Sequence, residues 1–195
     1  MFKFAFFVLL IFTGCSACQP ALESTGKNDT ETVEDERPWV TWETCGHKPG
    51  DNPCNFELEN QYGDTVELYD YHDQVVVIDL STMWCSVCAN IAPKGDEFTA
   101  TYGDENFEWL TLMIENSTGD DPDISDLNTW VTAYGITGHV LAGDRSLIDL
   151  NAETGYPVSA WPTLVVIDQD MTLYNGLVGW NEATIRGWVE PLLEE

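Results

Sequence analysis

The stretch QVVVIDLSTMWCSVC, residues 74–88, determines how the rest of the chain is interpreted. Residues 74–80 are mainly apolar and β-branched and do not alternate with polar residues, a pattern typical of a central strand buried on both faces. A helical pattern begins at Ser86, so Cys85 and Cys88 lie where the strand is followed by a helix. The stretch therefore predicts a buried strand that presents a Cys-x-x-Cys pair at its carboxyl end.

Strand and helix patterns alternate along the chain on both sides of this stretch. The expected strands are 56–58 and 65–68, which form a hairpin, then 74–80, 107–114, 140–141, 163–168 and 173–178; the expected helices are 86–102, 123–134, 146–153 and 182–193. Pro93 interrupts the first helix, and Gly135 ends the second. This order predicts an α/β domain with a mixed central β-sheet flanked by helices and preceded by an N-terminal β-hairpin.

The beginning of the chain has the pattern of an export signal. The unbroken apolar run 4–12 is too short for a membrane-spanning helix, which needs about 20 apolar residues. We therefore interpret residues 1–18 as a signal peptide. Its end, FTGC at residues 12–15, resembles the lipobox of bacterial lipoproteins and implies lipidation at Cys15. An ordinary cleavage near Ala17 is the alternative.

Charge and composition limit the choice of partners. Residues 19–37 are rich in Glu, Asp, Ser and Thr, which predicts an acidic flexible tether before a folded domain at 38–195. The whole chain has 34 Asp and Glu against 7 Lys and Arg, a formal net charge of -27. Such a surface repels phosphate, so nucleic acid is not expected as a partner. The 44% of hydrophobic residues suffice for a sizeable core.

The Cys85-Ser86-Val87-Cys88 pair carries the predicted chemistry. At a helix N-terminus, unpaired N–H groups and the helix dipole stabilise a thiolate, so Cys85 is the candidate nucleophile. Cys88 lies one turn later and is the candidate resolving cysteine for a mixed disulfide. The alternatives are half of a zinc site and a purely structural bond. Zinc needs further ligands, and the three histidines are scattered singly, so we expect no metal.

Several residues around this pair resemble the thioredoxin family. Asp79 stands on the buried strand where thioredoxins have a buried acid, and Pro93 stands where their active-site helix kinks. The sequence Trp161-Pro162-Thr163 resembles their cis-proline loop. The resemblance covers about residues 55–195 and implies a thioredoxin-like fold. It also implies that Asp79 relays a proton to and from the second cysteine.

The same resemblance assigns roles to the residues that flank the cysteines. Pro162 is expected to lie against the disulfide and to leave the backbone before it free for an extended substrate. Trp84, Trp161 and Thr163 are expected to shape the substrate-binding surface. Burial of Asp79 should raise its pKa, so that it exchanges protons near neutral pH.

The chain between Cys85 and Pro162 is longer than in a minimal thioredoxin, which indicates an inserted α/β segment before the cis-proline loop. This insertion, the hairpin and the exported tether resemble TlpA-like and ResA-like thiol–disulfide oxidoreductases. That resemblance implies a lipoprotein of the bacterial cell envelope, facing the periplasm, that reduces disulfides in extracytoplasmic proteins. It further implies a membrane thiol donor and no cofactor beyond the redox-active disulfide. Ser86 and Val87 stand where many members have two prolines, which leaves the direction of electron flow open.

Two other functions remain open from the sequence. A peroxiredoxin-like peroxidase needs a Pro-x-x-x-Thr-x-x-Cys environment; Thr82 fits this pattern, but Ile78 stands at the proline position. A non-enzymatic binding module or a copper-handling protein could use the same fold, because thiolates suit Cu(I).

Cys45 and Cys54 enclose a loop with two glycines and two prolines. We interpret them as a structural disulfide. A second redox pair is the alternative, and it is less favoured because the loop offers no helix N-terminus to activate a thiol.

Overall fold

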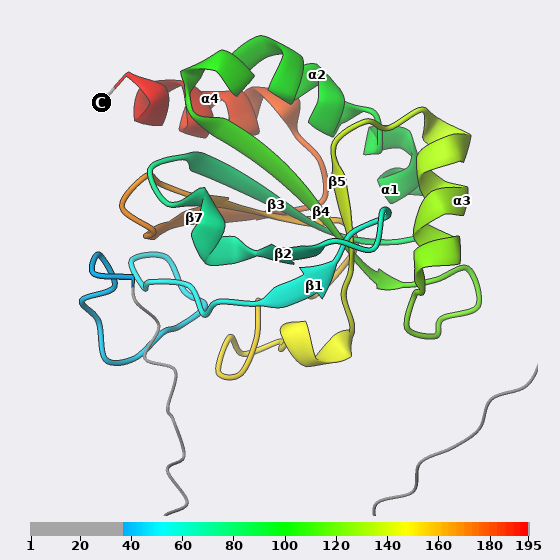
Figure 1. Cartoon of the computed structure of the whole chain (residues 1–195), viewed down its shortest axis with the longest axis horizontal. Coiled ribbons are helices and arrows are strands. Elements are labelled where there is room, and N and C mark those ends of the chain that lie inside the picture. Colours follow the sequence, from blue (N-terminus) through cyan, green and yellow to red (C-terminus); the bar gives the residue numbers. More distant parts are fainter. Residues whose placement is uncertain (1–36, 195) are drawn as a thin grey trace, which may run out of the picture. The chain divides into compact units, whose positions relative to one another are not determined.

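The computed structural model describes residues 37–194 (Figure 1). The predicted signal peptide 1–18, with Cys15, and the predicted tether up to residue 36 lie outside these residues. Within the described part of the chain, no helix is long and apolar enough to cross a lipid bilayer. The residues from Thr41 onward form one compact unit, and the elements below all belong to it.

A five-stranded mixed sheet forms the centre of this unit (Figure 1). Its strands are β3 (Val75–Thr82), β4 (Phe107–Glu115), β5 (His139–Ala142), β6 (Thr163–Ile167) and β7 (Leu173–Val178), in the spatial order β5-β4-β3-β6-β7. Strands β3, β4 and β5 pair in parallel, whereas β6 pairs antiparallel with β3 and β7 antiparallel with β6. A separate hairpin of β1 (Glu57–Glu59) and β2 (Thr65–Glu67) precedes the sheet. The predicted α/β fold with a mixed central sheet is confirmed.

Four α-helices are formed by the described residues. They are α1 (Ser86–Ile91), α2 (Lys94–Tyr102), α3 (Ile124–Tyr134) and α4 (Glu182–Leu193), and short 3₁₀ turns are η1 (Leu68–Tyr71), η2 (Gly103–Glu105) and η3 (Arg145–Leu147). The predicted helix 86–102 is divided at Pro93, because proline has no N–H to donate. The ends of α3 follow local signals: Asp123 and Asp126 form a capping box, and Gly135 takes the left-handed conformation.

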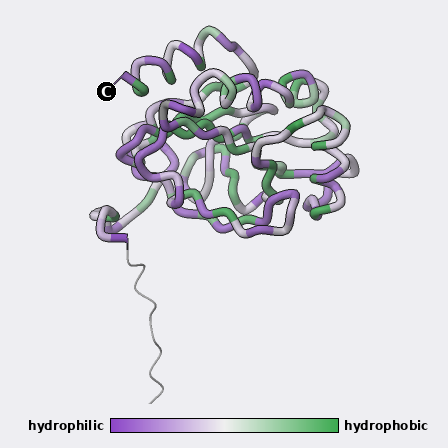
Figure 2. Tube along the Cα trace, turned by 45° about the horizontal axis from the view of Figure 1, so that its top comes forward, coloured by the Kyte–Doolittle hydropathy of each residue, from purple (hydrophilic) through white to green (hydrophobic). Residues whose placement is uncertain are grey.

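The two faces of the sheet are covered by different elements. Figure 1 shows α2 and α4 on one face, and β1, β2 and η3 on the other. The core on the helical face contains Val77 of β3, Phe98 of α2 and Val189 of α4. The same face continues to Met113 of β4, which packs with residues of α1 and α3. Figure 2 shows hydrophobic residues along the inner strands and hydrophilic residues along the outer loops.

The predicted helix at 146–153 is wrong. After η3 the chain continues as an irregular loop, in which Ala152 has a positive φ of 54° that no α-helix contains. The Asp149 carboxylate accepts hydrogen bonds from the backbone N–H groups of Asn151, Glu153 and Thr154. These bonds replace those that a helix would make, which is how aspartate competes with helix formation. The segment before the cis-proline loop therefore contributes α3 and β5 but no second helix.

Candidate active site

Cys85 and Cys88 lie at the junction of β3 and α1. Cys85 is the N-cap residue of α1, with extended backbone, and its Sγ accepts a hydrogen bond of 3.3 Å from the backbone N–H of Cys88. Cys85 is 9% exposed and Cys88 is completely buried, so Cys85 carries the outer sulfur. Both are free thiols. An N–H group directed at the outer sulfur stabilises a negative charge on it.

Backbone hydrogen bonds hold the segment between the end of β3 and the start of α1. The register of β3 against β4 shifts between Ser81 and Thr82, and the N–H of Met83 then donates to the carbonyl of Glu115 at 2.9 Å. The N–H of Cys85 donates to the carbonyl of Thr82 at 3.2 Å. This turn brings the first cysteine to the carboxyl end of the central strand, as the sequence pattern predicts.

Asp79 lies on β3, six positions before Cys85, and is 2% exposed. Burial raises its pKa to about 7, while hydrogen bonds from Ser81 and Thr111 act in the opposite direction. The Ser81 hydroxyl donates to Asp79 Oδ1 at 2.6 Å, and Thr111 stands opposite Asp79 in the register of β4. A carboxyl group with such a pKa gains and loses a proton near neutral pH.

The negative charge of this carboxyl group acts on the buried Cys88 thiol. Burial raises the pKa of Cys88 first, and its hydrogen bond to Cys85 and the negative charge of Asp79 raise it further. Hydrogen bonds from the Thr82 backbone and from the Ser81 side chain lower it, but they do not offset the burial. Cys88 therefore keeps its proton at neutral pH unless a base takes the proton away.

The loop before β6 lies next to the cysteines. The peptide bond between Trp161 and Pro162 is cis, and the Pro162 carbonyl accepts a hydrogen bond of 2.8 Å from the N–H of Gly179. Trp161 is partly buried against the hydrophobic cluster that contains Cys85 and Cys88. Thr163 is buried, and its hydroxyl donates to the carbonyl of Ala160 at 2.8 Å. The structure thus brings the residues of the predicted cis-proline loop together with the Cys-x-x-Cys pair.

Trp84 is held by residues that the sequence did not single out. Its ring is 51% exposed, and its Nε1 donates to the Glu115 carboxylate at 2.7 Å. Glu115 is buried at the end of β4 and also forms an ion pair with Arg145 of η3. The one signal in the sequence is that the acidic Glu115 directly follows the expected strand 107–114. Nothing in the sequence indicates Arg145 as its partner.

Thr82 is the residue that fits the peroxiredoxin pattern. Its side chain is completely buried, and its Oγ1 has no hydrogen-bond partner among the described residues. Ile78, at the position of the pattern's proline, is a buried residue of β3. Across residues 37–194, no group of three or more His, Cys, Asp or Glu side chains is arranged to hold a metal ion.

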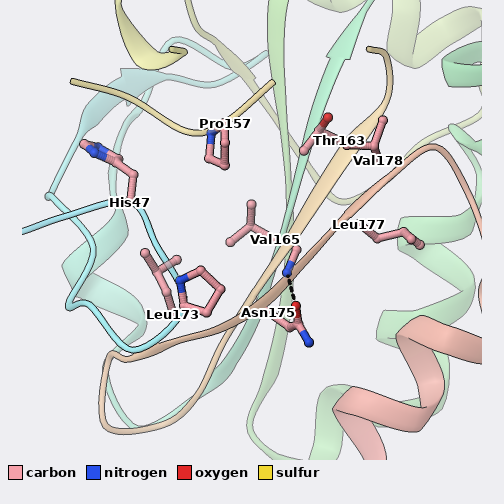
Figure 3. A pocket seen from close by; sticks show the side chains of 10 residues that line it. His47, Pro157, Thr163, Val165, Leu173, Asn175, Leu177 and Val178 are labelled. Carbon is pink, nitrogen blue, oxygen red and sulfur yellow. Dashed lines mark hydrogen bonds between the residues drawn. The ribbon is translucent and has the colours of Figure 1, made fainter. Parts of the chain in front are cut away.

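Cys45 and Cys54 form a disulfide that closes a loop beside β7. The loop pairs with the start of that strand, since the N–H of Gly50 donates to the Leu173 carbonyl and the N–H of Leu173 donates to the Asp51 carbonyl, both at 2.8 Å. An apolar cavity of about 280 Å³ lies between this loop and strands β6 and β7 (Figure 3). Thr163 lines the cavity and is the residue that it shares with the candidate active site.

Comparisons with known proteins identify the family of the chain. The model of the AhpC/TSA family matches residues 49–175. The thioredoxin-like protein YneN of Bacillus subtilis is 22% identical over 134 residues, which cover 69% of this chain and 74% of that protein.

Solved structures show the same fold. A putative thiol:disulfide interchange protein DsbE from Chlorobium tepidum is similar with a TM-score of 0.61 and 22% identity, over 75% of this chain and 99% of that chain. The pneumococcal exposed lipoprotein thioredoxin Etrx1 of Streptococcus pneumoniae has a TM-score of 0.55 and 26% identity, over 72% of this chain and 98% of that chain. These similarities confirm the predicted thioredoxin-like fold and the resemblance to the thiol–disulfide oxidoreductases of that superfamily.

Proposed function

Because the chain belongs to the AhpC/TSA family, we propose that it is a thiol–disulfide oxidoreductase whose Cys85–Cys88 dithiol reduces disulfides in extracytoplasmic proteins. One observation carries the proposal: Cys85 is the N-cap residue of α1 and accepts a hydrogen bond from the Cys88 N–H, while the Cys88 thiol is buried and the negative charge of Asp79 raises its pKa. This arrangement supplies an outer nucleophile, an inner resolving thiol and a base.

The reaction proceeds by two exchanges of sulfur partners. The Cys85 thiolate attacks one sulfur of the substrate disulfide, which forms a mixed disulfide and releases the other substrate sulfur as a thiolate. Asp79 then takes the proton of Cys88, and the Cys88 thiolate attacks Cys85 Sγ. The second substrate sulfur leaves, so the substrate gains two electrons and the Cys85–Cys88 disulfide is formed. A membrane thiol donor reduces this disulfide again.

The residues around the outer sulfur bind the substrate chain in this proposal. Trp84 and Val87 are exposed large hydrophobic residues on either side of Cys85, a composition found at protein docking surfaces. Pro162 presents the backbone before it to an extended segment of the substrate, and Trp161 and Thr163 flank that segment.

Export and anchoring are part of the proposal. The signal peptide 1–18 directs the chain out of the cytoplasm, and a lipid on Cys15 holds it in the bacterial cell envelope, with the domain facing the periplasm. The Cys45–Cys54 disulfide supports this location, because such bonds persist mainly in oxidising compartments. One of the similar structures is itself described as an exposed lipoprotein thioredoxin.

Trapping of a reaction intermediate tests the exchange mechanism. The full chain with Cys88→Ser should accumulate a mixed disulfide between Cys85 and substrate proteins, because the resolving thiol is missing. The matched variant Cys85→Ser should form none. If Cys88→Ser binds partner proteins but forms no mixed disulfide that a thiol reductant can release, the proposed enzyme activity is wrong.

The reduction potential of the Cys85–Cys88 pair tests the direction of electron flow. We expect a value near or below about -250 mV, typical of a reductant that needs a donor, whereas a value near about -120 mV identifies an oxidant. Equilibration of the full chain in a dithiol redox buffer, followed by alkylation and mass spectrometry, resolves this pair from Cys45 and Cys54. If the pair shows no reversible two-electron step, the proposal is wrong and partner or metal binding takes its place.

Peroxide reduction is a second candidate, favoured by the unpartnered hydroxyl of Thr82 close to Cys85. In that reaction the Cys85 thiolate attacks one peroxide oxygen and the O–O bond breaks. Cys85 becomes a sulfenic acid, and the other oxygen leaves as hydroxide, which takes a proton from solvent. A hydroxyl that donates a hydrogen bond to the peroxide favours this attack. Replacement Thr82→Val should then slow oxidation of Cys85 by hydrogen peroxide but not its exchange with disulfides. If hydrogen peroxide oxidises the unchanged chain no faster than free cysteine, this candidate fails.

A further inference from the structure

The apolar cavity of about 280 Å³ begins beside the cis-proline loop. Strand β6 runs antiparallel to β3, so its first residue, Thr163, lies opposite Leu80 near the end of β3 that leads to Cys85. Thr163 and Val165 are two positions apart on β6, so their side chains lie on the same face of the sheet, and both line the cavity. Val178, opposite Thr163 on β7, also lines it and is 49% exposed. The cavity therefore reaches the surface next to the candidate active site.

A glycine forms part of the cavity floor. Gly176 stands opposite Val165 on β7, and a Cβ atom at this position would meet the Leu164 carbonyl oxygen at 3.5 Å, an ordinary contact distance, with no clash. The next residue, Leu177, points to the other face of the sheet and packs against the core that contains Val189 of α4 (Figure 3). The space above Gly176 is thus open to a side chain supplied by another molecule.

Backbone hydrogen bonds hold the walls of the cavity, so it is formed before anything binds. On one side the disulfide loop supplies His47, and the same loop is bonded to β7 at Leu173. On the other side stands Pro157, which follows Tyr156. The N–H and the carbonyl of Tyr156 both form hydrogen bonds of 2.8 Å with segment 147–149, and its buried ring contacts the His47 ring edge to face, with 5.2 Å between centroids.

We propose that this cavity binds a large apolar side chain of the disulfide substrate, close in sequence to the cysteine that Cys85 attacks. The inference rests on the proposed function and adds a specificity-determining subsite to it. Pockets that hold whole small molecules usually measure about 300–1,000 Å³, so a volume of about 280 Å³ suits a single side chain. The two polar side chains that the sheet supplies, Thr163 and Asn175, already bond to backbone groups. The lining therefore offers mainly apolar surface to the occupant.

The distance along the sheet fits a substrate chain in extended conformation. Strands rise by about 3.4 Å per residue, so the three steps from Pro162 to Val165 span roughly 10 Å. A substrate segment that passes Pro162 therefore reaches the cavity with a residue about two to four positions from its cysteine.

A substrate protein fits the cavity better than the chain's own N-terminal segment does. Residues 19–36 are rich in Glu and Asp and contain few large apolar residues. The formal net charge of -27 makes the approach of such an acidic segment unfavourable. A large apolar side chain is stabilised by burial alone, without a charge partner.

Peptides that carry a chromogenic disulfide test the subsite. Each probe is a peptide of alanine and lysine with one cysteine, joined by a disulfide to thionitrobenzoate. Leucine or alanine stands at one position, from two to five residues before or after that cysteine. The Cys85 thiolate attacks the peptide sulfur, the S–S bond breaks, and the thionitrobenzoate anion leaves with the electron pair, because an aromatic thiolate is the better leaving group. The absorbance of this anion gives the second-order rate constant.

The variants fill the cavity without a change in the cysteines or the cis-proline loop. All measurements use the full chain with Cys15→Ser and Cys18→Ser, in the dithiol form. Gly176→Leu fills the cavity from its floor, and Gly176→Ala fills a part of it. Gly187→Leu is the matched control, because it adds the same side chain to an exposed position of α4 where a Cβ atom has no neighbour within 4 Å. Dithiobis(nitrobenzoate), which has no peptide, gives the basal rate.

In the unchanged chain we expect leucine at the best position to raise the rate constant over alanine by roughly tenfold to a hundredfold, as full burial of an aliphatic side chain predicts. Gly176→Leu should reduce this preference to less than about twofold, with Gly176→Ala in between. Gly187→Leu should keep it. The basal rate should stay within about twofold in every variant, which also shows that the variants are folded.

Crosslinking locates the bound side chain without any variant of the cavity. A photoreactive diazirine analogue of leucine at the preferred position should crosslink to Pro157 or to residues 173–178. Crosslinks confined to Trp84 and Val87 would show that the side chain binds on the surface beside Cys85, and the subsite proposal would be wrong.

The rate measurements separate failure of the subsite from failure of the proposed function. If leucine and alanine peptides react equally at every position, or if the preference for leucine survives in Gly176→Leu, the cavity is not the subsite, while the exchange reaction itself still stands. If the unchanged chain releases no thionitrobenzoate from the peptides or from the basal reagent, the dithiol exchange fails, and the proposed function fails with it.

Discussion

The indole N–H of Trp84 donates to the buried carboxylate of Glu115 across 2.7 Å, which ties the ring beside the outer cysteine to the end of β4. Arg145 of η3 forms an ion pair with the same carboxylate, although its own side chain is mostly exposed. A buried carboxylate needs such partners, because an unpaired charge in the interior costs several kcal/mol. The orientation of Trp84 therefore depends on a residue from another strand.

Replacement Glu115→Ala should free the Trp84 ring and leave Arg145 without this partner. We expect the free energy of unfolding to fall by about 2 kcal/mol, the order of a hydrogen bond to a charged group, because the exposed Arg145 adds little. Reduction of a protein disulfide should slow down, whereas the reaction of Cys85 with a small aromatic disulfide should not. Urea unfolding and stopped-flow exchange measure the two effects. Equal unfolding free energies for Glu115→Ala and for Glu153→Ala, an exposed control, would contradict this role.

Asp79 should make the folded chain less stable as the pH rises. Its pKa is about 7 in the folded chain, whereas that of an exposed aspartate is 3.8. Between these two values the folded state binds a proton that the unfolded state has lost, so the free energy of unfolding falls with rising pH. The decrease amounts to roughly 4 kcal/mol and is complete above pH 7.

Replacement Asp79→Asn removes this titration. We expect the variant to exceed the unchanged chain in unfolding free energy by roughly 2 to 4 kcal/mol at pH 8, and by much less at pH 4. Urea unfolding of the dithiol form across pH 4 to 8 gives both values. Asp121→Asn, which removes an exposed carboxylate, is the control and should keep the slope of the unchanged chain. A slope that survives in Asp79→Asn would show that another group causes it.

The Cys45–Cys54 disulfide can be tested as a structural bond. Replacement of both residues with serine should lower the free energy of unfolding by about 2 to 3 kcal/mol, the value expected for a short closed loop. The reduction potential of the Cys85–Cys88 pair should stay unchanged. Unfolding curves and redox equilibration with alkylation measure the two quantities. A shift in that potential would instead favour electron transfer between the two pairs.

The elements and site residues that short sequence patterns mark could be predicted from the sequence. The β-branched run before Cys85 identified β3. The position of Asp79 relative to Cys85 and the short motif Trp161-Pro162-Thr163 indicated the thioredoxin-like fold. These signals are local, because periodicity, caps and short motifs depend on residues that are close together in the chain. The same local signals located both ends of α3.

The remaining parts depend on contacts that no local pattern encodes. The helix expected at 146–153 is replaced by a loop because the Asp149 side chain binds several backbone N–H groups at once. Trp84 donates to Glu115 of β4, and Glu115 pairs with Arg145 of η3, so these contacts require the folded sheet.

The loop closed by Cys45 and Cys54 has a consequence for association between molecules. Strand β7 is the last strand of the sheet, and unpaired groups on such an edge are a template for pairing with another chain. At Leu173, where the strand begins, the backbone N–H and carbonyl form hydrogen bonds with Asp51 and Gly50. The disulfide loop therefore shields part of the edge from intermolecular β-pairing. We therefore expect reduction of these two cysteines to uncover this edge and to promote aggregation as well as unfolding.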